Sequence, residues 1–285
     1  ILLEVQDFDD ISDVTPLMAK VYPNGLADVN HFHAAGGLGF MIGDLLSVGL
    51  LHPDTKTVMG KGLQAYMQEP VMQDGQMQYR MGAGCSGNEK ILRPAHAPFQ
   101  CSGGLRQLRG NLGQGMIKIS AVAKERHLVE AKARVFQSQD EVKAAYQAGE
   151  FTEDTIIVVR FQGPVSNGMP ELHALTPILS VLQDRGLRVA LVTDGRMSGA
   201  SGKVPSAIHI SPEAAVGGPL ARVRDGDLIR LNASAGSLEN TAKDFAKRSV
   251  VLANLRGNGS GVGRELFDVF RRNVGLASAG AAVVV

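Results

Sequence analysis

The sequence predicts an α/β protein in which strands alternate with helices from about residue 103 onward. Short apolar runs bounded by charge and glycine recur in this part of the chain, and each is typical of a buried strand. Helical patterns with their own start signals separate several of these runs. An Asp-Gly turn at Asp225 adds a hairpin. Together these observations predict a compact α/β or barrel-like mixed domain flanked by helices.

Composition narrows the possible partners. The chain has 285 residues, which favours two domains, and its net charge of +1 indicates neither a nucleic-acid partner nor an anionic membrane. No apolar run is long enough to span a membrane. Cys85 and Cys101 fit neither a disulfide framework nor a zinc spacing, which predicts a reducing compartment, the cytoplasm. Because the first residue is Ile1 and not methionine, we expect a fragment of a longer protein.

The first hundred residues carry mostly helical patterns. Helices are predicted from Asp13 to about Gly25, over residues 34–51, and over residues 57–68. Residues 71–100 lose this periodicity and are rich in Met, Gln, Gly and Pro, which indicates a linker. We therefore expect a domain boundary near residue 100, with domains at 1–100 and 101–285.

The remaining residues contain the alternating elements. Strands are predicted at 115–122, 131–136, 155–161, 187–194, 207–210 and 281–285, and on both sides of a turn at 223–228. Helices are predicted at 138–149, where Ser138 and Glu141 form a capping box, and at 170–184, 212–215, 241–249 and 264–273.

A glycine-rich loop follows the predicted strand 187–194 and contains Ser198. Open α/β sheets place their chemistry at such strand ends, although a polar connecting loop explains the same residues. A P-loop is excluded, because Met197 stands where the first glycine is needed and Val204 where Ser or Thr is needed. The serine is also displaced by one position from a G-x-S-x-G elbow.

Glu171 is the second candidate in this part of the chain. A strand is predicted to end at Phe161 and a helix to begin at Pro170, which would place Glu171 in the first turn of that helix. The carboxylate then either complements the helix dipole or binds a hard cation such as Mg²⁺. If the two strands are neighbours, Glu171 and Ser198 lie close together.

Three histidines allow more than one interpretation. His31 and His33 flank Phe32 and would face the same way on an extended segment, so they are either a metal pair or ordinary hydrogen-bonding groups, the second being favoured. His209 lies within an apolar run, which favours a core histidine over a catalytic one. The glycines at 37, 39 and 43 lack the preceding strand of a dinucleotide site, so we interpret them as helix packing.

Five motifs in order along the chain resemble the dihydroxy-acid and sugar-acid dehydratase family. They are Ala27–Gly37, Gly104–Gly113, Gly168–Glu171, Thr193–Gly199 and Ser211–Gly218. The Asn-His-Phe-His, Leu172-His-Ala-Leu and Arg-Met-Ser variants favour a member that acts on a phosphorylated sugar acid over the branched-chain enzyme.

The resemblance implies an enzyme that removes water from a 2,3-dihydroxy carboxylate to give a 2-keto-3-deoxy acid. It also implies an iron–sulfur cluster (4Fe-4S or 2Fe-2S), a Mg²⁺ ion, a small anionic sugar-acid substrate and a homodimer. Ser198 would be the base that removes the C2 proton, and Glu171 a Mg²⁺ ligand. Residues 1–100 would be the tail of the cluster-bearing domain, and residues 101–285 a swivelling β-barrel-like domain flanked by helices.

Two departures from the family pattern shape the expectations for this chain. The cluster cysteines would lie upstream, and Cys85 and Cys101 match no cluster position, so we expect this chain alone to be inactive. A phosphate group needs cationic partners, for which Arg196, Lys203 and Arg188 are candidates, although basic residues near a strand end are usually solvated. Another sugar acid, a branched-chain dihydroxy acid, or a non-catalytic small-molecule-binding domain remain alternatives.

Overall fold

The computed structural model describes residues 3–198 and 202–284, which form two compact units. One unit comprises residues 11–104, and the other comprises residues 1–10 with 105–285. Helix α1 (Val5–Val14) contributes its first residues to the second unit. The domain boundary that the sequence predicts near residue 100 stays a prediction. No helix in the described ranges is both long and apolar enough to cross a membrane.

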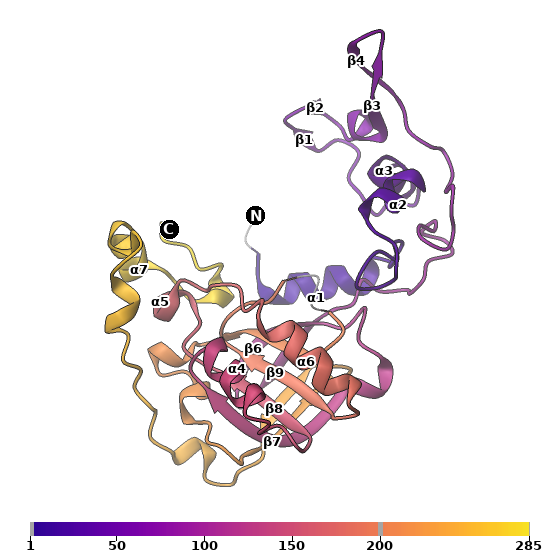
Figure 1. The fold of residues 1–285 in the computed structure, drawn as a ribbon. Coiled ribbons are helices and arrows are strands. Elements are labelled where there is room, and N and C mark those ends of the chain that lie inside the picture. Colours follow the sequence, from indigo (N-terminus) through magenta and orange to yellow (C-terminus); the bar gives the residue numbers. More distant parts are fainter. Residues whose placement is uncertain (1–2, 199–201, 285) are drawn as a thin grey trace. The chain divides into compact units, whose positions relative to one another are not determined.

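The larger unit is built around a closed barrel of eight strands (Figure 1). Their order around the barrel is β10-β6-β5-β12-β11-β7-β8-β9. The bounds are β5 Leu105–Gly110, β6 Gly113–Lys118, β7 Leu128–Phe136, β8 Thr155–Val159, β9 Val189–Thr193, β10 Ser206–Ser211, β11 Leu228–Asn232 and β12 Ser237–Asn240. Strands β7, β8, β9 and β10 run parallel to one another. The prediction of a barrel-like α/β fold flanked by helices is confirmed.

Strands β8 and β9 are almost entirely apolar because both of their faces are buried. In β8, Ile156 and Val158 point into the barrel core, whereas Ile157 and Val159 pack under the helices. Strand β9 repeats the pattern, with Ala190 inside the barrel. Since successive side chains of a strand face opposite ways, two cores share one sheet. This explains why the sequence shows continuous apolar runs here.

Two helices cover the outer face of the parallel strands (Figure 1). Helix α4 (Gln139–Gln147) begins after Ser138, whose side chain accepts the Glu141 amide. The other half of the predicted capping box differs, because the Glu141 carboxylate accepts the Gln137 amide and not the Ser138 amide. Helix α6 is Leu175–Asp184 and buries its apolar side against the sheet. The shorter helices of this unit are α5 Pro164–Asn167 and α7 Asp268–Asn273, with 3₁₀ turns at Lys124–Arg126, Ala214–Val216, Pro219–Arg222, Phe245–Lys247, Arg256–Gly259, Arg264–Phe267 and Ala277–Ala279.

Several predicted elements of the larger unit are wrong. The helix predicted from Pro170 begins only at Leu175, because Glu171 is held in extended backbone by a β-bridge to Arg196. The hairpin lies not at 223–228 but between β11 and β12. Residues 281–284 form no strand, and the predicted helix 241–249 is reduced to a 3₁₀ turn.

The smaller unit combines two helices with two hairpins (Figure 1). Its elements are α2 Val29–Ala34, α3 Gly37–Ser47, β1 Lys56–Thr57, β2 Gly60–Lys61, a 3₁₀ turn at Gln64–Met67, β3 Gln68–Gln73 and β4 Gln76–Met81. A small core of Met18, Ala35, Phe40 and Leu92 holds it together. The helix predicted over 57–68 is absent, because Gly60 and Gly62 take left-handed angles. The helix predicted from Asp13 is also wrong, since α1 ends at Val14.

Candidate active site

Three loops leave the same end of the barrel because they follow parallel neighbouring strands. Strand β8 pairs with β9 from Thr155 to Val159, and β9 pairs with β10 through Leu191 and Val192. The loops that follow these strands therefore start side by side. They are residues 160–174, 194–205 and 212–218, and they contain three of the motifs that the sequence analysis identified.

The first two loops are joined directly at Glu171 and Arg196. These residues form an isolated parallel β-bridge, in which the Leu172 amide donates to the Arg196 carbonyl at 3.0 Å. The Arg196 Nε donates to the Met169 carbonyl at 2.9 Å, and Nη1 lies 3.9 Å from the Glu171 carboxylate. Glu171 is therefore in extended backbone and not in the first turn of a helix. The strands before the two loops are neighbours, and the Glu171 loop meets the loop of Ser198 at Arg196. The proximity of Glu171 and Ser198 themselves stays a prediction.

Ser198 lies two residues beyond this junction and is half-buried. Residues 199–201, which complete the glycine-rich motif, lie outside the described residues. The bridge between Glu171 and Arg196 fixes the backbone two residues before Ser198. The chain therefore reaches Ser198 from a hydrogen-bonded position next to Glu171.

The basic candidates separate into two groups. Arg196 is at the junction, whereas the Lys203 carbonyl accepts a hydrogen bond from Gln183, near the C-terminal end of α6. Arg188 precedes β9, so it lies at the opposite end of that strand from the Ser198 loop. The prediction that Arg188 lies near the Ser198 loop is therefore wrong. The Arg196 side chain thus lies beside the Glu171 carboxylate.

Asp194 is fully buried at the start of the second loop. Its carboxylate accepts backbone hydrogen bonds from Gln162 at 2.9 Å, Ala214 at 2.9 Å and Phe161 at 3.1 Å. Burial raises the pKa of Asp194, and the three amides oppose this change by stabilising the charged form. One side chain thus connects all three loops.

Glu213 is a second buried carboxylate, with only 2% of its surface exposed. Its two oxygens accept the backbone amides of Ser166 at 2.9 Å and Val165 at 3.2 Å. Burial and the neighbouring Asp194 charge raise the pKa of Glu213 to about 7, although these two amides act in the opposite direction.

His209 borders the same region from β10. Its amide donates to the Gly195 carbonyl at 2.9 Å, and its φ of +58° places it in the left-handed region that few non-glycine residues adopt. The strand register shifts here, which marks a bulge. Burial and the Arg196 charge lower the pKa of the His209 imidazole. The side chain is half-buried, and the interpretation of His209 as a core histidine and not a catalytic one stays a prediction.

A cavity of about 640 Å³ opens beside Met169 and His209 in the same unit. Apolar side chains of α1, β6 and the C-terminal segment line most of it, among them Phe8, Met116 and Ala279. Because the lining is mostly apolar, this cavity suits an apolar group better than an anionic ligand.

The residues present can supply part of a Mg²⁺ site but not an iron–sulfur site. Glu171 offers a partly exposed carboxylate, and Mg²⁺ usually takes one or two carboxylates together with water and substrate oxygens. Within the described residues, no group of three or more His, Cys, Asp or Glu side chains could hold a metal. Cys85 and Cys101 are both exposed free thiols, and two thiols do not provide the ligand set of a cluster.

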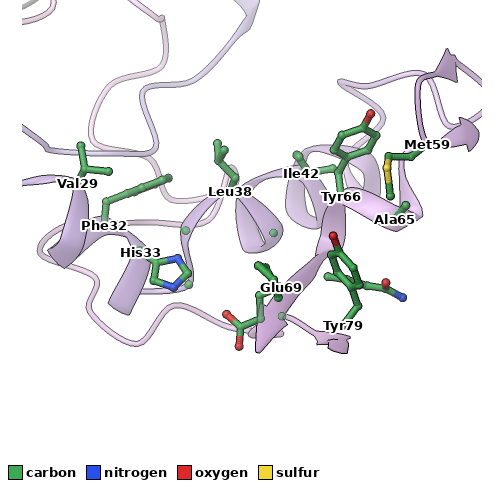
Figure 2. A pocket seen from close by; sticks show the side chains of 16 residues that line it. Val29, Phe32, His33, Leu38, Ile42, Met59, Ala65, Tyr66, Glu69 and Tyr79 are labelled. Atoms are coloured by element: carbon green, nitrogen blue, oxygen red, sulfur yellow. The ribbon is translucent and has the colours of Figure 1, made fainter. Parts of the chain in front are cut away.

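The histidine pair of the smaller unit does not form a metal site. His31 and His33 lie on helix α2, where residues two apart point to opposite sides. The His31 imidazole contacts the Asp28 carboxylate at 2.8 Å and completes the cap of the helix. His33 instead lines a cavity of about 410 Å³, with Phe32 on its side and Tyr66 and Tyr79 opposite (Figure 2).

Two models of one protein family match most of the chain. The model of the dihydroxy-acid/6-phosphogluconate dehydratase C-terminal domain matches residues 90–281, and the model of the N-terminal domain matches residues 1–66. The chain belongs to this dehydratase family. The C-terminal match contains all three loops and every candidate residue from Glu171 to Glu213.

Individual relatives from this family cover nearly the whole chain. It is 52% identical to phosphogluconate dehydratase of Rhizobium meliloti over 287 residues, which cover 100% of this chain and 47% of that protein. It is 54% identical to phosphogluconate dehydratase of Pseudomonas aeruginosa, over 99% of this chain and 46% of that protein. Identity with dihydroxy-acid dehydratase of Sulfurisphaera tokodaii is 38%, over 83% of this chain and 40% of that protein. The chain spans about half the length of these relatives.

The contacts of Glu213 are not predictable from the sequence. Its motif was recognised, but a carboxylate beside a Pro in a loop is usually solvated. Its two amide donors lie 47 and 48 positions upstream, so no local pattern could reveal the contact. The only available signal was the apolar sequence on both sides of the motif.

Proposed function

We propose that the protein to which this chain belongs converts 6-phospho-D-gluconate to 2-dehydro-3-deoxy-6-phosphogluconate, a step of the Entner–Doudoroff pathway. The observation that carries the proposal is the β-bridge between Glu171 and Arg196, which brings the Glu171 loop next to the chain that leads to Ser198. The names and identities of the phosphogluconate dehydratases support this substrate over a branched-chain dihydroxy acid.

In this proposal Ser198 acts as the base. Its oxygen, as the alkoxide, takes the proton from C2 of the substrate, and the hydroxyl group at C3 leaves as water after protonation. The resulting enol becomes the 2-keto acid. A proton next to a carboxylate is weakly acidic, so the developing negative charge needs stabilisation. Mg²⁺ held by Glu171 would supply that charge compensation when bound.

Arg196 is the better candidate for contacting the anionic substrate. It lies at the junction with its guanidinium partly exposed, next to the Glu171 carboxylate. A planar guanidinium can bind a carboxylate or a phosphate with two parallel hydrogen bonds. We keep Lys203 as a second candidate, although its backbone lies beside the end of α6. An iron–sulfur cluster held by upstream cysteines, a homodimer and a cytoplasmic location complete the proposal.

The test is Ser198→Ala in the complete protein, including the upstream half that the relatives carry. We expect formation of the 2-keto acid to fall by roughly 1000-fold or more, because the base is lost. Iron content and thermal stability should stay unchanged. The matched control is Ser206→Ala at the start of β10, which should keep its turnover.

Three substrates then separate the alternatives within the family. Rates are compared on 6-phosphogluconate, gluconate and 2,3-dihydroxyisovalerate with the same unmodified enzyme. A preference for gluconate or dihydroxyisovalerate would contradict the proposed substrate, and retained turnover of the Ser198 variant would contradict the proposed base.

A further inference from the structure

Glu213 is a buried carboxylate whose contacts lie entirely within the loops of the candidate site. Its oxygens accept the amides of Val165 and Ser166, which open helix α5. The side chain is 2% exposed, so water does not compete for these hydrogen bonds. Its position therefore fixes where α5 begins.

Helix α5 transmits this position to the junction. The Met169 amide donates to the Gly163 carbonyl at 3.2 Å, so the chain after α5 folds back against its start. The Met169 carbonyl then accepts the Arg196 Nε at 2.9 Å. A continuous series of hydrogen bonds thus runs from Glu213 through α5 to the residue two positions before Ser198.

A second connection reaches the Ser198 loop from the other side. The residue after Glu213 is Ala214, whose amide donates to Asp194 at 2.9 Å. Asp194 begins the loop that holds Arg196 and Ser198. The segment around Glu213 is therefore attached to both loops, and neither attachment involves a solvent-exposed side chain.

The geometry requires a carboxylate at position 213. Each oxygen accepts a different amide, so an amide side chain would provide one acceptor and oppose the second N–H with its own NH₂ group. Gly163 leaves room for the carboxylate, since a Cβ atom there would lie 1.7 Å from the Glu213 oxygen. Glu213 and Gly163 fit together as a pair.

We propose that Glu213 is a positioning residue, which holds the Glu171 and Ser198 loops in register through α5 and Arg196 without touching the substrate. The part of this inference that concerns turnover rests on the proposed dehydratase function. The part that concerns the loops does not rest on that function, because it predicts the rate of amide hydrogen exchange in the loops.

The test compares Glu213→Gln with the unmodified protein by amide hydrogen exchange in the complete protein. The Leu172 and His209 amides donate to the Arg196 and Gly195 carbonyls and not to Glu213. We expect both to exchange about tenfold faster or more, because loss of one charged hydrogen bond frees α5. The kcat should fall roughly 10- to 100-fold, with KM changing far less, because a small displacement of reacting groups lowers the rate strongly.

Asp227→Asn is the matched control. Asp227 is also a buried carboxylate with backbone and side-chain donors, but it lies at the turn before β11 and β12. This variant should be less stable than the unmodified protein and yet keep its kcat and its exchange at Leu172 and His209. Glu213→Gln should instead lower kcat and speed amide exchange at Leu172 and His209, without a comparable loss of stability. Its stability is kept because the substitution also removes the charge repulsion between Glu213 and Asp194.

Two results would overturn the inference. One is faster exchange at Val165 and Ser166 alone, with Leu172 and His209 unchanged. The other is equal effects of the Glu213 and Asp227 variants on kcat, which would indicate a general loss of stability. If the unmodified enzyme does not dehydrate 6-phosphogluconate, the proposed function fails, and the exchange measurement still decides the positioning role.

Discussion

At the scale of single residues, Gly163 is a position where only glycine fits, for a steric reason. Its φ of −72° suits any residue, so backbone conformation does not demand glycine. Space does, because Glu213 occupies the place of a Cβ atom. The buried carboxylate and the glycine must therefore be considered together in any variant of this loop.

Gly163→Ala should destabilise the protein by about 2–4 kcal/mol, because the methyl group and the carboxylate cannot both keep their places. Urea unfolding of the purified chain measures this change. The control is Gly257→Ala, where no atom lies within 4 Å of the new Cβ and φ is not left-handed. We expect that control to stay within about 0.5 kcal/mol of the unmodified protein. Equal stabilities of the two variants would show that the loop moves aside freely.

At the scale of elements, Asp227 joins three parts of the barrel wall. It accepts the Arg224 amide at 3.0 Å, the Asn240 side chain of β12 at 2.8 Å, and Arg248 at 2.6 Å. Burial opposes its ionisation, but these hydrogen bonds outweigh burial and lower the pKa of Asp227. The turn before β11, strand β12 and the segment after it are held by one charged group.

Asp227→Asn should therefore lower the free energy of unfolding by about 2–3 kcal/mol near neutral pH. Because the folded-state pKa lies below the unfolded one, the stabilising effect is present above about pH 4 and is lost as the pH falls through the folded pKa. Urea midpoints at about pH 7 and pH 3 should thus differ more for the unmodified protein than for the variant. A variant with unchanged stability at neutral pH would contradict this account.

The elements also show what the sequence could predict. Strands β8 and β9 were visible because burial on both faces leaves an unbroken apolar run. Helix α6 was placed too early, since the pairing of Glu171 with Arg196 is a long-range contact that overrides local helical preference. The helix predicted at 57–68 does not form because Gly60 and Gly62 adopt left-handed backbone angles, which the apolar spacing does not reveal. Ser198 and Glu171 were marked by their place at strand ends, whereas Glu213 depends on donors from a distant loop.

At the scale of the whole molecule, the chain supplies a carboxylate and a hydroxyl group but no complete metal site within its described residues. We expect this chain alone to fold, because its barrel has its own core, and to form no detectable 2-keto acid from 6-phosphogluconate. Circular dichroism checks the fold, and a colorimetric keto-acid assay checks the activity. The complete protein is the positive control, and turnover by the isolated chain would contradict the expectation.

The closed barrel has a consequence for how this protein associates. Every strand of the barrel has a neighbour on both sides, so the barrel offers no open edge to which a strand of another molecule could add. The hairpins β1–β2 and β3–β4 are different, because each is a separate two-stranded sheet. Self-association through strand addition, including aggregation, would therefore start in the smaller unit, and a charged residue on the edge of β4 is the substitution to try first when solubility is limiting.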